Sequence, residues 1–72
     1  MEEYIKELIK EFREYDVFEK VSSYDGKKEN IRYYYILHKN GLKYHTFELN
    51  KKVTYKELEE IFINSYIKSE ED

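Results

Sequence analysis

The side chains of this chain that could take part in catalysis are few and form no known motif. The sequence contains two histidines, four serines and no cysteine. None of the serines lies in the signature of an activated nucleophile, and no glycine-rich phosphate loop is present. Two histidines, His38 and His45, would supply only half of the ligands of a structural zinc site. We therefore expect no enzymatic activity, no catalytic residue, no metal site and no cofactor.

Carboxylates, in contrast, recur near the N-terminus with helical spacing. On a helix, one side carries what we call the acidic row: Glu3, Glu7, Glu11 and Glu14. Lys6, Lys10 and Arg13 fall together beside it. Like charges four residues apart repel by roughly 0.2–0.5 kcal/mol, so the row favours a basic partner that relieves this repulsion. Glu57, Glu60 and the acidic tail extend the predicted partner-binding site, and an ordinary solvated helix face is the alternative interpretation.

A second candidate site lies in the middle of the chain, where basic and aromatic residues interleave. Its members are Arg32, Tyr34, Ile36, Lys43, His45 and Phe47. Sheets that bind single-stranded nucleic acid use rings to stack on bases and cations to hold phosphates. The exposed apolar side chain of Ile36 suits contact with protein better. The sequence therefore leaves two interpretations of this surface. It is an interface for nucleic acid, or an interface for protein, where the partner can be a second copy of this chain.

Residues 2–15 are predicted to form the helix that carries the acidic row. Apolar side chains recur there every three or four residues and form one stripe, the expected core face. The stripe comprises Met1, Tyr4, Ile5, Leu8, Ile9, Phe12 and Tyr15.

Three strands are predicted at residues 17–24, 30–38 and 42–49, between the turn sequences Asp25-Gly26 and Asn40-Gly41. Asn-Gly favours a two-residue type I′ turn, which sets Lys39 opposite Leu42. Counting back pairs His38 with Lys43 and Ile36 with His45. This register predicts a face formed by Arg32, Tyr34, Ile36, His38, Lys43, His45, Phe47 and Leu49. The opposite face then carries Ile31, Tyr33, Tyr35, Leu37, Leu42, Tyr44 and Thr46.

The second helix has the clearest predicted start, because Thr54-x-x-Glu57 is a capping box. Val53 and Leu58 occupy the positions of a hydrophobic staple. Its expected buried stripe comprises Tyr55, Leu58, Ile61, Phe62 and Tyr66. Ile63 and Ile67 lie off this stripe and predict a wider core or a dimer contact. The expected fold is α+β with order α-β-β-β-α, both helices on one face of a three-stranded antiparallel sheet, in a single domain over residues 1–68 with a flexible acidic tail at 69–72.

The charges are separated along the chain, although the formal net charge is only −3. Residues 1–19 carry −4, residues 20–56 carry +6 and residues 57–72 carry −5. Such fields steer charged partners. No apolar run approaches the roughly 18 residues of a membrane span, and the acidic start differs from a signal peptide, so we expect a cytoplasmic protein without a membrane partner.

In its shortness, its clustered carboxylates and its lack of Ala, Pro, Trp, Cys and Gln, the chain resembles the small acidic host-takeover inhibitors of lytic bacteriophages. The resemblance implies a phage or mobile-element protein in the cytoplasm of an infected cell. It would inhibit a host protein with a basic surface, with its carboxylates in the place of DNA phosphates. The alternative is a nucleic-acid-binding regulator that uses the basic aromatic surface. The element order also resembles the double-stranded RNA-binding domain, but that family's Gly-Pro-x-His loop has no counterpart at residues 25–29, so its function is not transferred.

Overall fold

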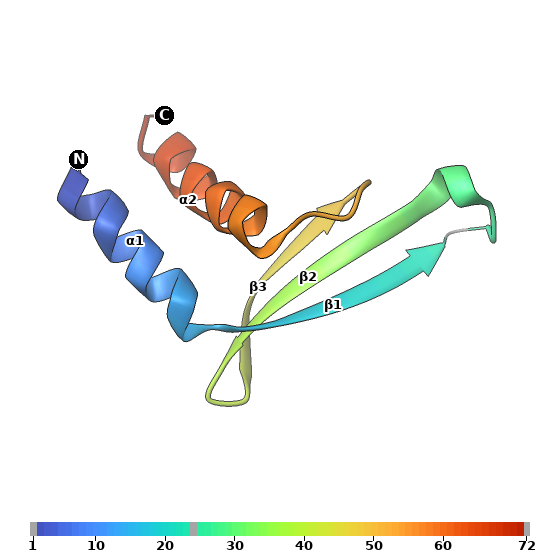
Figure 1. Ribbon diagram of the computed structural model, residues 1–72, viewed down its shortest axis with the longest axis horizontal. Coiled ribbons are helices and arrows are strands. Elements are labelled where there is room, and N and C mark those ends of the chain that lie inside the picture. Colours follow the sequence, from blue (N-terminus) through green and yellow to red (C-terminus); the bar gives the residue numbers. More distant parts are fainter. Residues whose placement is uncertain (1, 24, 72) are drawn as a thin grey trace. The chain divides into compact units, whose positions relative to one another are not determined.

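The computed structural model describes residues 2–23 and 25–71, with side chains described up to residue 68. Its elements, in order, are α1 (Glu2–Glu14), β1 (Asp16–Ser23), the short 3-10 helix η1 (Lys28–Asn30), β2 (Ile31–Lys39), β3 (Leu42–Leu49) and α2 (Tyr55–Glu71) (Figure 1). The predicted α+β class and α-β-β-β-α order are confirmed. Neither helix, as far as the described residues extend, has the length and apolar character needed to cross a bilayer.

The chain divides into two compact units. The helical unit comprises Met1–Glu14 and Val53–Asp72, and the sheet unit comprises Tyr15–Lys52. The prediction that both helices cover one face of the sheet stays a prediction, as does the single domain over residues 1–68. Helix α2 continues to Glu71, across most of the predicted acidic tail, while Asp72 lies outside the described residues. The tail's flexibility also stays a prediction.

In the helical unit, α1 and α2 are joined by aromatic packing. Phe12 and Phe62 are fully buried, with ring centroids 5.3 Å apart. Leu8 and Leu58, each one helical turn before one of these rings, are buried as well. Tilted rings at this distance contribute about 0.5–1.5 kcal/mol beyond the apolar area that they bury. The predicted stripes are thus confirmed at their centres. The expectation for Tyr55 is wrong: its ring contacts Phe12 at 5.0 Å, but at the first turn of α2 it stays 51% exposed.

The start of α2 follows its sequence signature. The backbone N–H of Thr54 donates to the Glu57 carboxylate at 3.0 Å, and the backbone N–H of Glu57 donates to the Thr54 hydroxyl at 3.1 Å. Val53 and Leu58, the residues of the predicted staple, are both buried. The capping box therefore satisfies N–H groups that would otherwise lack a partner in the first helical turn.

The sheet is antiparallel with strand order β1-β2-β3. Asn40 and Gly41 both have positive φ, 54° and 78°, as a type I′ turn requires. Lys39 pairs with Leu42 and His38 with Lys43, as predicted. Asp25-Gly26 is also a turn: the backbone N–H of Lys27 donates to the Asp25 side chain at 3.0 Å, and Gly26 has a φ of 78°. Tyr24, the last residue of the first predicted strand, lies outside the described residues.

The register beyond the turn differs from the prediction, because β3 contains a bulge. The pairing steps from His38 with Lys43 to Leu37 with His45, which leaves Tyr44 as an extra residue. Every later pair is therefore displaced by one residue, and a shift of one residue moves each side chain to the opposite face. The predicted pair of Ile36 with His45 is wrong, since Ile36 pairs with Thr46. A bulge of this kind has no signal in a turn sequence.

The bulge redistributes the predicted faces. Leu37, Tyr35 and Tyr33 pair with His45, Phe47 and Leu49, and these six residues define the Tyr35 face. The residues of the opposite face, which we call the Tyr34 face, are Arg32, Tyr34 and Ile36 of β2, His38 and Lys43 near the turn, Thr46 and Glu48 of β3, and Asp16, Phe18, Lys20 and Ser22 of β1. The predicted grouping of His45, Phe47 and Leu49 with Arg32 and Tyr34 is therefore wrong.

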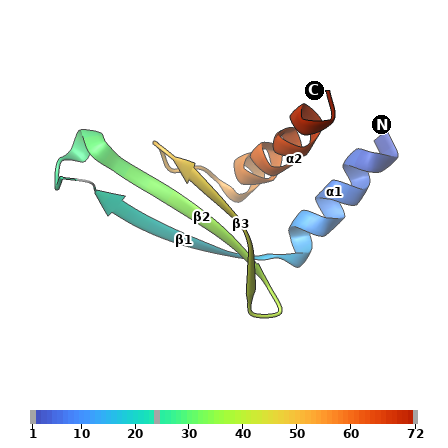
Figure 2. The same ribbon diagram turned by 180° about the vertical axis from the view of Figure 1, so that it is seen from behind.

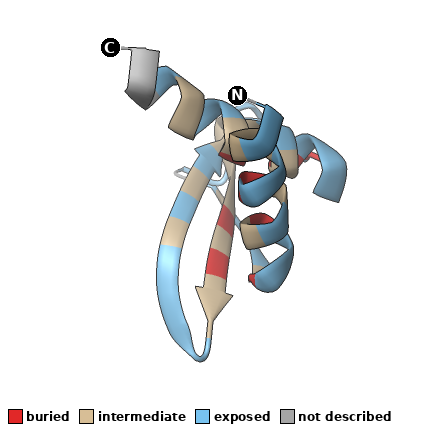
Figure 3. Cartoon of the chain, turned by 90° about the vertical axis from the view of Figure 1, so that its left-hand side faces the viewer, coloured by how far each residue is buried: buried red, intermediate tan, exposed pale blue. Residues whose placement is uncertain are grey.

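The Tyr35 face holds the core of the sheet unit. Tyr35 and Leu37 are buried, and red segments mark buried residues along β2 in Figure 3. Tyr15, predicted as the end of the first helix, instead belongs to this unit and is buried, with its ring 5.6 Å from that of His45. The Tyr35 hydroxyl donates to the carboxylate of Glu19, its cross-strand partner, at 2.8 Å. A buried aromatic ring thus reaches a polar partner at the edge of the sheet.

Thr54→Ala is expected to lower the free energy of unfolding by about 1 kcal/mol, because it removes the side-chain cap of α2. Urea denaturation followed by circular dichroism measures this change. Thr54→Ser is the matched control, since serine keeps the hydroxyl and should stay close to the unsubstituted protein. Equal losses for both variants would contradict a role for the hydroxyl.

Candidate functional site

The acidic row lies on α1, and most of it is accessible to a partner. Glu3, Glu7 and Glu14 are exposed, whereas Glu11 is half-buried. The exposed members lie along one side of a helix that the Phe12 contact holds against α2. The row is therefore carried by a helix that packs on a second helix, rather than by an irregular acidic segment.

The two predicted acids of α2 have different surroundings. Glu57 is exposed, but its carboxylate accepts the Thr54 N–H and so belongs to the helix cap. Glu60 is exposed and lies one turn further along α2. We therefore retain Glu60 as a contact candidate and assign Glu57 a structural role.

Glu59, which was not among the predicted site residues, connects the two helices. The Nε atom of Arg13 donates to a Glu59 carboxylate oxygen at 3.3 Å, with the Glu59 side chain 13% exposed. Position 59 is four residues after Tyr55 and three before Phe62, so the helical period already placed this acid on the apolar stripe of α2. An acid on an apolar stripe indicates a basic partner on the neighbouring element.

The acidic row is bordered by lysines of the same helix. A shallow depression in the surface is lined by Glu3, Lys6, Glu7 and Lys10. The surface of α1 therefore presents a negative row beside a positive one. A partner that fits this pattern needs basic groups along the acidic row and tolerates cations at its border.

Glu11 faces α2 near Tyr66. Burial raises the pKa of the Tyr66 hydroxyl, and the nearby negative charge of Glu11 raises it further. Both effects disfavour the phenolate, the first because it loses hydration and the second by repulsion. Glu11 is therefore the member of the acidic row that is least suited to contact an external partner.

Charge is divided between the two structural units. The helical unit contains five basic and eleven acidic residues, a formal charge of −6, and the sheet unit contains eight basic and five acidic residues, a formal charge of +3. The segregation inferred along the sequence therefore coincides with the units of the structure.

The structure separates the basic aromatic candidate set. Arg32, Tyr34, Ile36 and Lys43 lie on the Tyr34 face, and His45 and Phe47 lie on the Tyr35 face. The stacked rings of His45 and Phe47, 6.3 Å apart, are thus on the side of the sheet that also carries buried Tyr35. One strand of nucleic acid on either face would meet only part of the set.

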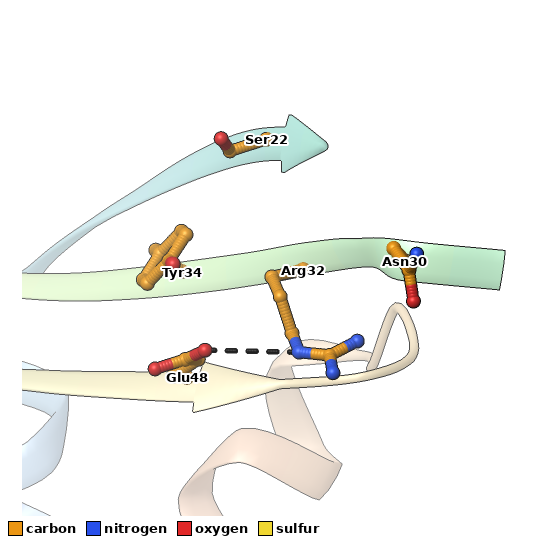
Figure 4. Close-up of a pocket in the computed structure, with 5 residues that line it drawn as sticks. All are labelled: Ser22, Asn30, Arg32, Tyr34 and Glu48. Atoms are coloured by element: carbon orange, nitrogen blue, oxygen red, sulfur yellow. Dashed lines mark ion pairs between the residues drawn. The ribbon is translucent and has the colours of Figure 1, made fainter. Parts of the chain in front are cut away.

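A recess on the Tyr34 face has a volume of about 390 Å³ and is lined by Ser22, Asn30, Arg32, Tyr34 and Glu48 (Figure 4). Three of its polar side chains, those of Asn30, Arg32 and Glu48, already interact within the chain. Arg32 Nε lies 3.7 Å from a Glu48 carboxylate oxygen, and another guanidinium nitrogen donates to the Ile31 carbonyl at 3.2 Å. The Asn30 amide donates to Asp25 at 2.7 Å. The recess therefore pairs the Arg32 and Glu48 charges with each other, and its described lining contains neither histidine nor cysteine.

His38 is the one histidine on the Tyr34 face. Its ring meets that of Phe18 edge to face, with centroids 4.8 Å apart, and its Nδ1 atom is buried without a hydrogen-bond partner in the described structure. Across the described residues, no group of three or more potential metal ligands is close enough together to hold an ion. The ring of His38 thus packs against Phe18 on this face.

Comparison with known proteins gave no relative. No protein-family model matches the chain, and no curated protein sequence or solved structure matches it either.

Glu11→Gln is expected to lower the pKa of Tyr66 towards the usual value of 10.0, because it removes the second cause of the increase. Burial, the larger cause, remains, so the pKa should stay above that of an exposed tyrosine. The Tyr66 pKa is higher in the folded state than in the unfolded state, so the folded state favours the protonated hydroxyl. The stability that depends on this protonation is complete below pH 10, the usual tyrosine pKa, and is lost as the pH rises through the Tyr66 pKa. NMR titration of ring-labelled tyrosine measures the shift. Glu3→Gln, an exposed member of the same row, is the control and should leave the Tyr66 pKa unchanged.

Proposed function

We propose that the protein acts without catalysis, by binding a second protein that carries a basic surface, and that the exposed carboxylates of α1 make the contact. The observation that carries this proposal is the helical row of exposed Glu3, Glu7 and Glu14 on a unit of formal charge −6. Complementary charge of this kind accelerates encounter and excludes partners of the wrong sign.

The finer form of the proposal concerns the class of partner. A row of carboxylates along a helix offers negative charges at repeated intervals, as a phosphate backbone does. We therefore propose a host nucleic-acid-binding protein as the target, inhibited because the carboxylates of α1 occupy its phosphate-binding surface. The resemblance to phage host-takeover inhibitors supports this choice of target, and Lys6 and Lys10 at the border of the row restrict which basic surfaces fit.

The register of the sheet weakens the alternative of direct nucleic-acid binding. That interpretation needs basic side chains and aromatic rings on one face of the sheet. His45 and Phe47, however, lie on the Tyr35 face, and Arg32 lies on the Tyr34 face. Arg32 also has Glu48 beside it at 3.7 Å. Binding of a nucleic acid is accordingly the outcome that would favour the alternative.

Glu7→Lys is expected to weaken capture of the partner by about five- to tenfold in Kd, on the order of 1 kcal/mol, because it replaces attraction with repulsion at an exposed contact. Glu29→Lys is the matched control, since it changes the net charge equally at an exposed residue of η1 in the sheet unit. The immobilised variants are compared in pull-downs from bacterial lysate, followed by mass spectrometry.

The expected result is a basic protein retained by the unsubstituted chain and by Glu29→Lys, reduced with Glu7→Lys, and released by duplex DNA. Raising the salt to about 1 M, where the Debye length falls to roughly 3 Å, should also release it. Equal capture by both variants would reject the acidic row as the contact. Retardation of single- or double-stranded probes in a gel shift, without protein capture, would support the alternative.

A further inference from the structure

The two edges of the sheet differ in their ability to accept another strand. In the order β1-β2-β3, β1 and β3 are the outer strands (Figure 2). β3 contains the Tyr44 bulge, whereas β1 pairs with β2 from Asp16 to Ser23 without a shift. A bulge interrupts the hydrogen-bonding pattern of an edge and protects it from pairing. β1 is therefore the edge that remains regular.

The side chains of β1 are unusually exposed for a strand. Phe18 is 55% and Val21 is 54% exposed, and Asp16, Glu19 and Lys20 are exposed as well. The strand contains neither proline nor glycine. A regular edge strand with exposed apolar side chains offers its outward N–H and C=O groups as a template for an added strand.

We propose that the added strand is β1 of a second copy of this chain, paired antiparallel about a two-fold axis at Phe18. Directly opposite side chains in an antiparallel pair share a face, whereas neighbouring residues of one strand point to opposite faces. Two identical strands related by a two-fold axis must therefore place one residue opposite its own copy. With Phe18 in that position, Asp16 lies opposite Lys20 of the second copy, and Lys20 lies opposite Asp16 of the second copy. The pair therefore contains one aromatic contact flanked by two ion pairs on the Tyr34 face.

Charge selects this register over its neighbours. A pair centred on Glu19 sets two carboxylates opposite each other, and a pair centred on Lys20 sets two ammonium groups opposite each other. Like charges in directly opposed positions destabilise a sheet, and opposite charges stabilise it. Within β1, pairs centred on Val17 or Val21 place no opposite charges together, so only the register centred on Phe18 uses both Asp16 and Lys20.

The residues that would form these contacts are available in the chain. Within the described residues, neither Asp16 nor Lys20 forms an ion pair. Glu19, on the Tyr35 face, accepts the Tyr35 hydroxyl at 2.8 Å and is held apart from the Asp16 and Lys20 contacts. The self-pairing uses no residue of the acidic row, so it stands or fails separately from the proposed function.

Sedimentation equilibrium over a range of concentrations tests the ion pairs. The unsubstituted protein is expected to dimerise, and Lys20→Glu should weaken the dimer about tenfold or more, because it converts two attractive pairs into two repulsive ones. Combining it with Asp16→Lys should restore dimerisation, since the charges are then exchanged. Lys43→Glu, an exposed residue on β3, is the control and should not change the dimer. Circular dichroism establishes that each variant is folded.

A cross-link tests the register even where a charge variant fails to fold. The chain has no cysteine, so Phe18→Cys introduces a single thiol. Opposed residues in antiparallel strands have Cα atoms about 4.5–5.5 Å apart, within the range of a disulfide. Mild oxidation should therefore link Phe18→Cys into a covalent dimer and leave Val21→Cys, which is equally exposed, largely monomeric.

Three results would overturn the proposal. The first is a protein that stays monomeric at every soluble concentration. The second is a dimer that Lys20→Glu leaves unchanged, which would place the contact away from the β1 edge, for instance at Ile63 and Ile67. The third is equal or faster cross-linking of Val21→Cys, which would reject the register centred on Phe18.

Discussion

The extra residue at Tyr44 is the constraint on which the chemistry of the sheet depends. It sets His45 and Phe47 on the side of Tyr35 and Leu37, and it leaves Arg32, Tyr34 and Ile36 with Thr46 and Glu48. Without the bulge, cations and rings would lie on one surface. With it, the rings of β3 join the apolar face, and the opposite face becomes a mixture of charges that includes the Arg32 and Glu48 pair.

The division of charge coincides with the division of the chain into two packing units. The helical unit has an aromatic core around Phe12 and Phe62 and an excess of carboxylates, whereas the sheet unit has its core at Tyr35 and Leu37 and an excess of lysines. Repulsion within the acidic row is tolerated because buried rings and the Arg13 contact with Glu59 hold α1 and α2 together. A surface that is fixed by packing can retain a charge pattern that a flexible segment would relax.

The elements and their order could be predicted because each has a local signal. Apolar periodicity identified α1, Thr54 with Glu57 marked the start of α2, and Asn40-Gly41 fixed the hairpin turn. The composition of the sheet face could not be predicted, because a bulge depends on how Tyr44 and its neighbours pack rather than on the turn. The acidic row was predictable as a helical pattern. That Glu11 is half-buried and close enough to Tyr66 of α2 to raise its pKa could not be predicted, because it depends on how the helices pack.

The helical unit is built from the two ends of the chain, while the sheet unit is one continuous segment. During synthesis, α1 leaves the ribosome before Tyr55 and Phe62, whose rings contact Phe12, have been added to the chain. The hairpins close short loops and assemble from neighbouring residues. The pairing of α1 with α2 closes a longer loop and must wait until α2 has been synthesised. Translation therefore exposes the apolar stripe of α1 for an interval, and the charged residues beside that stripe help to keep the nascent chain in solution during it.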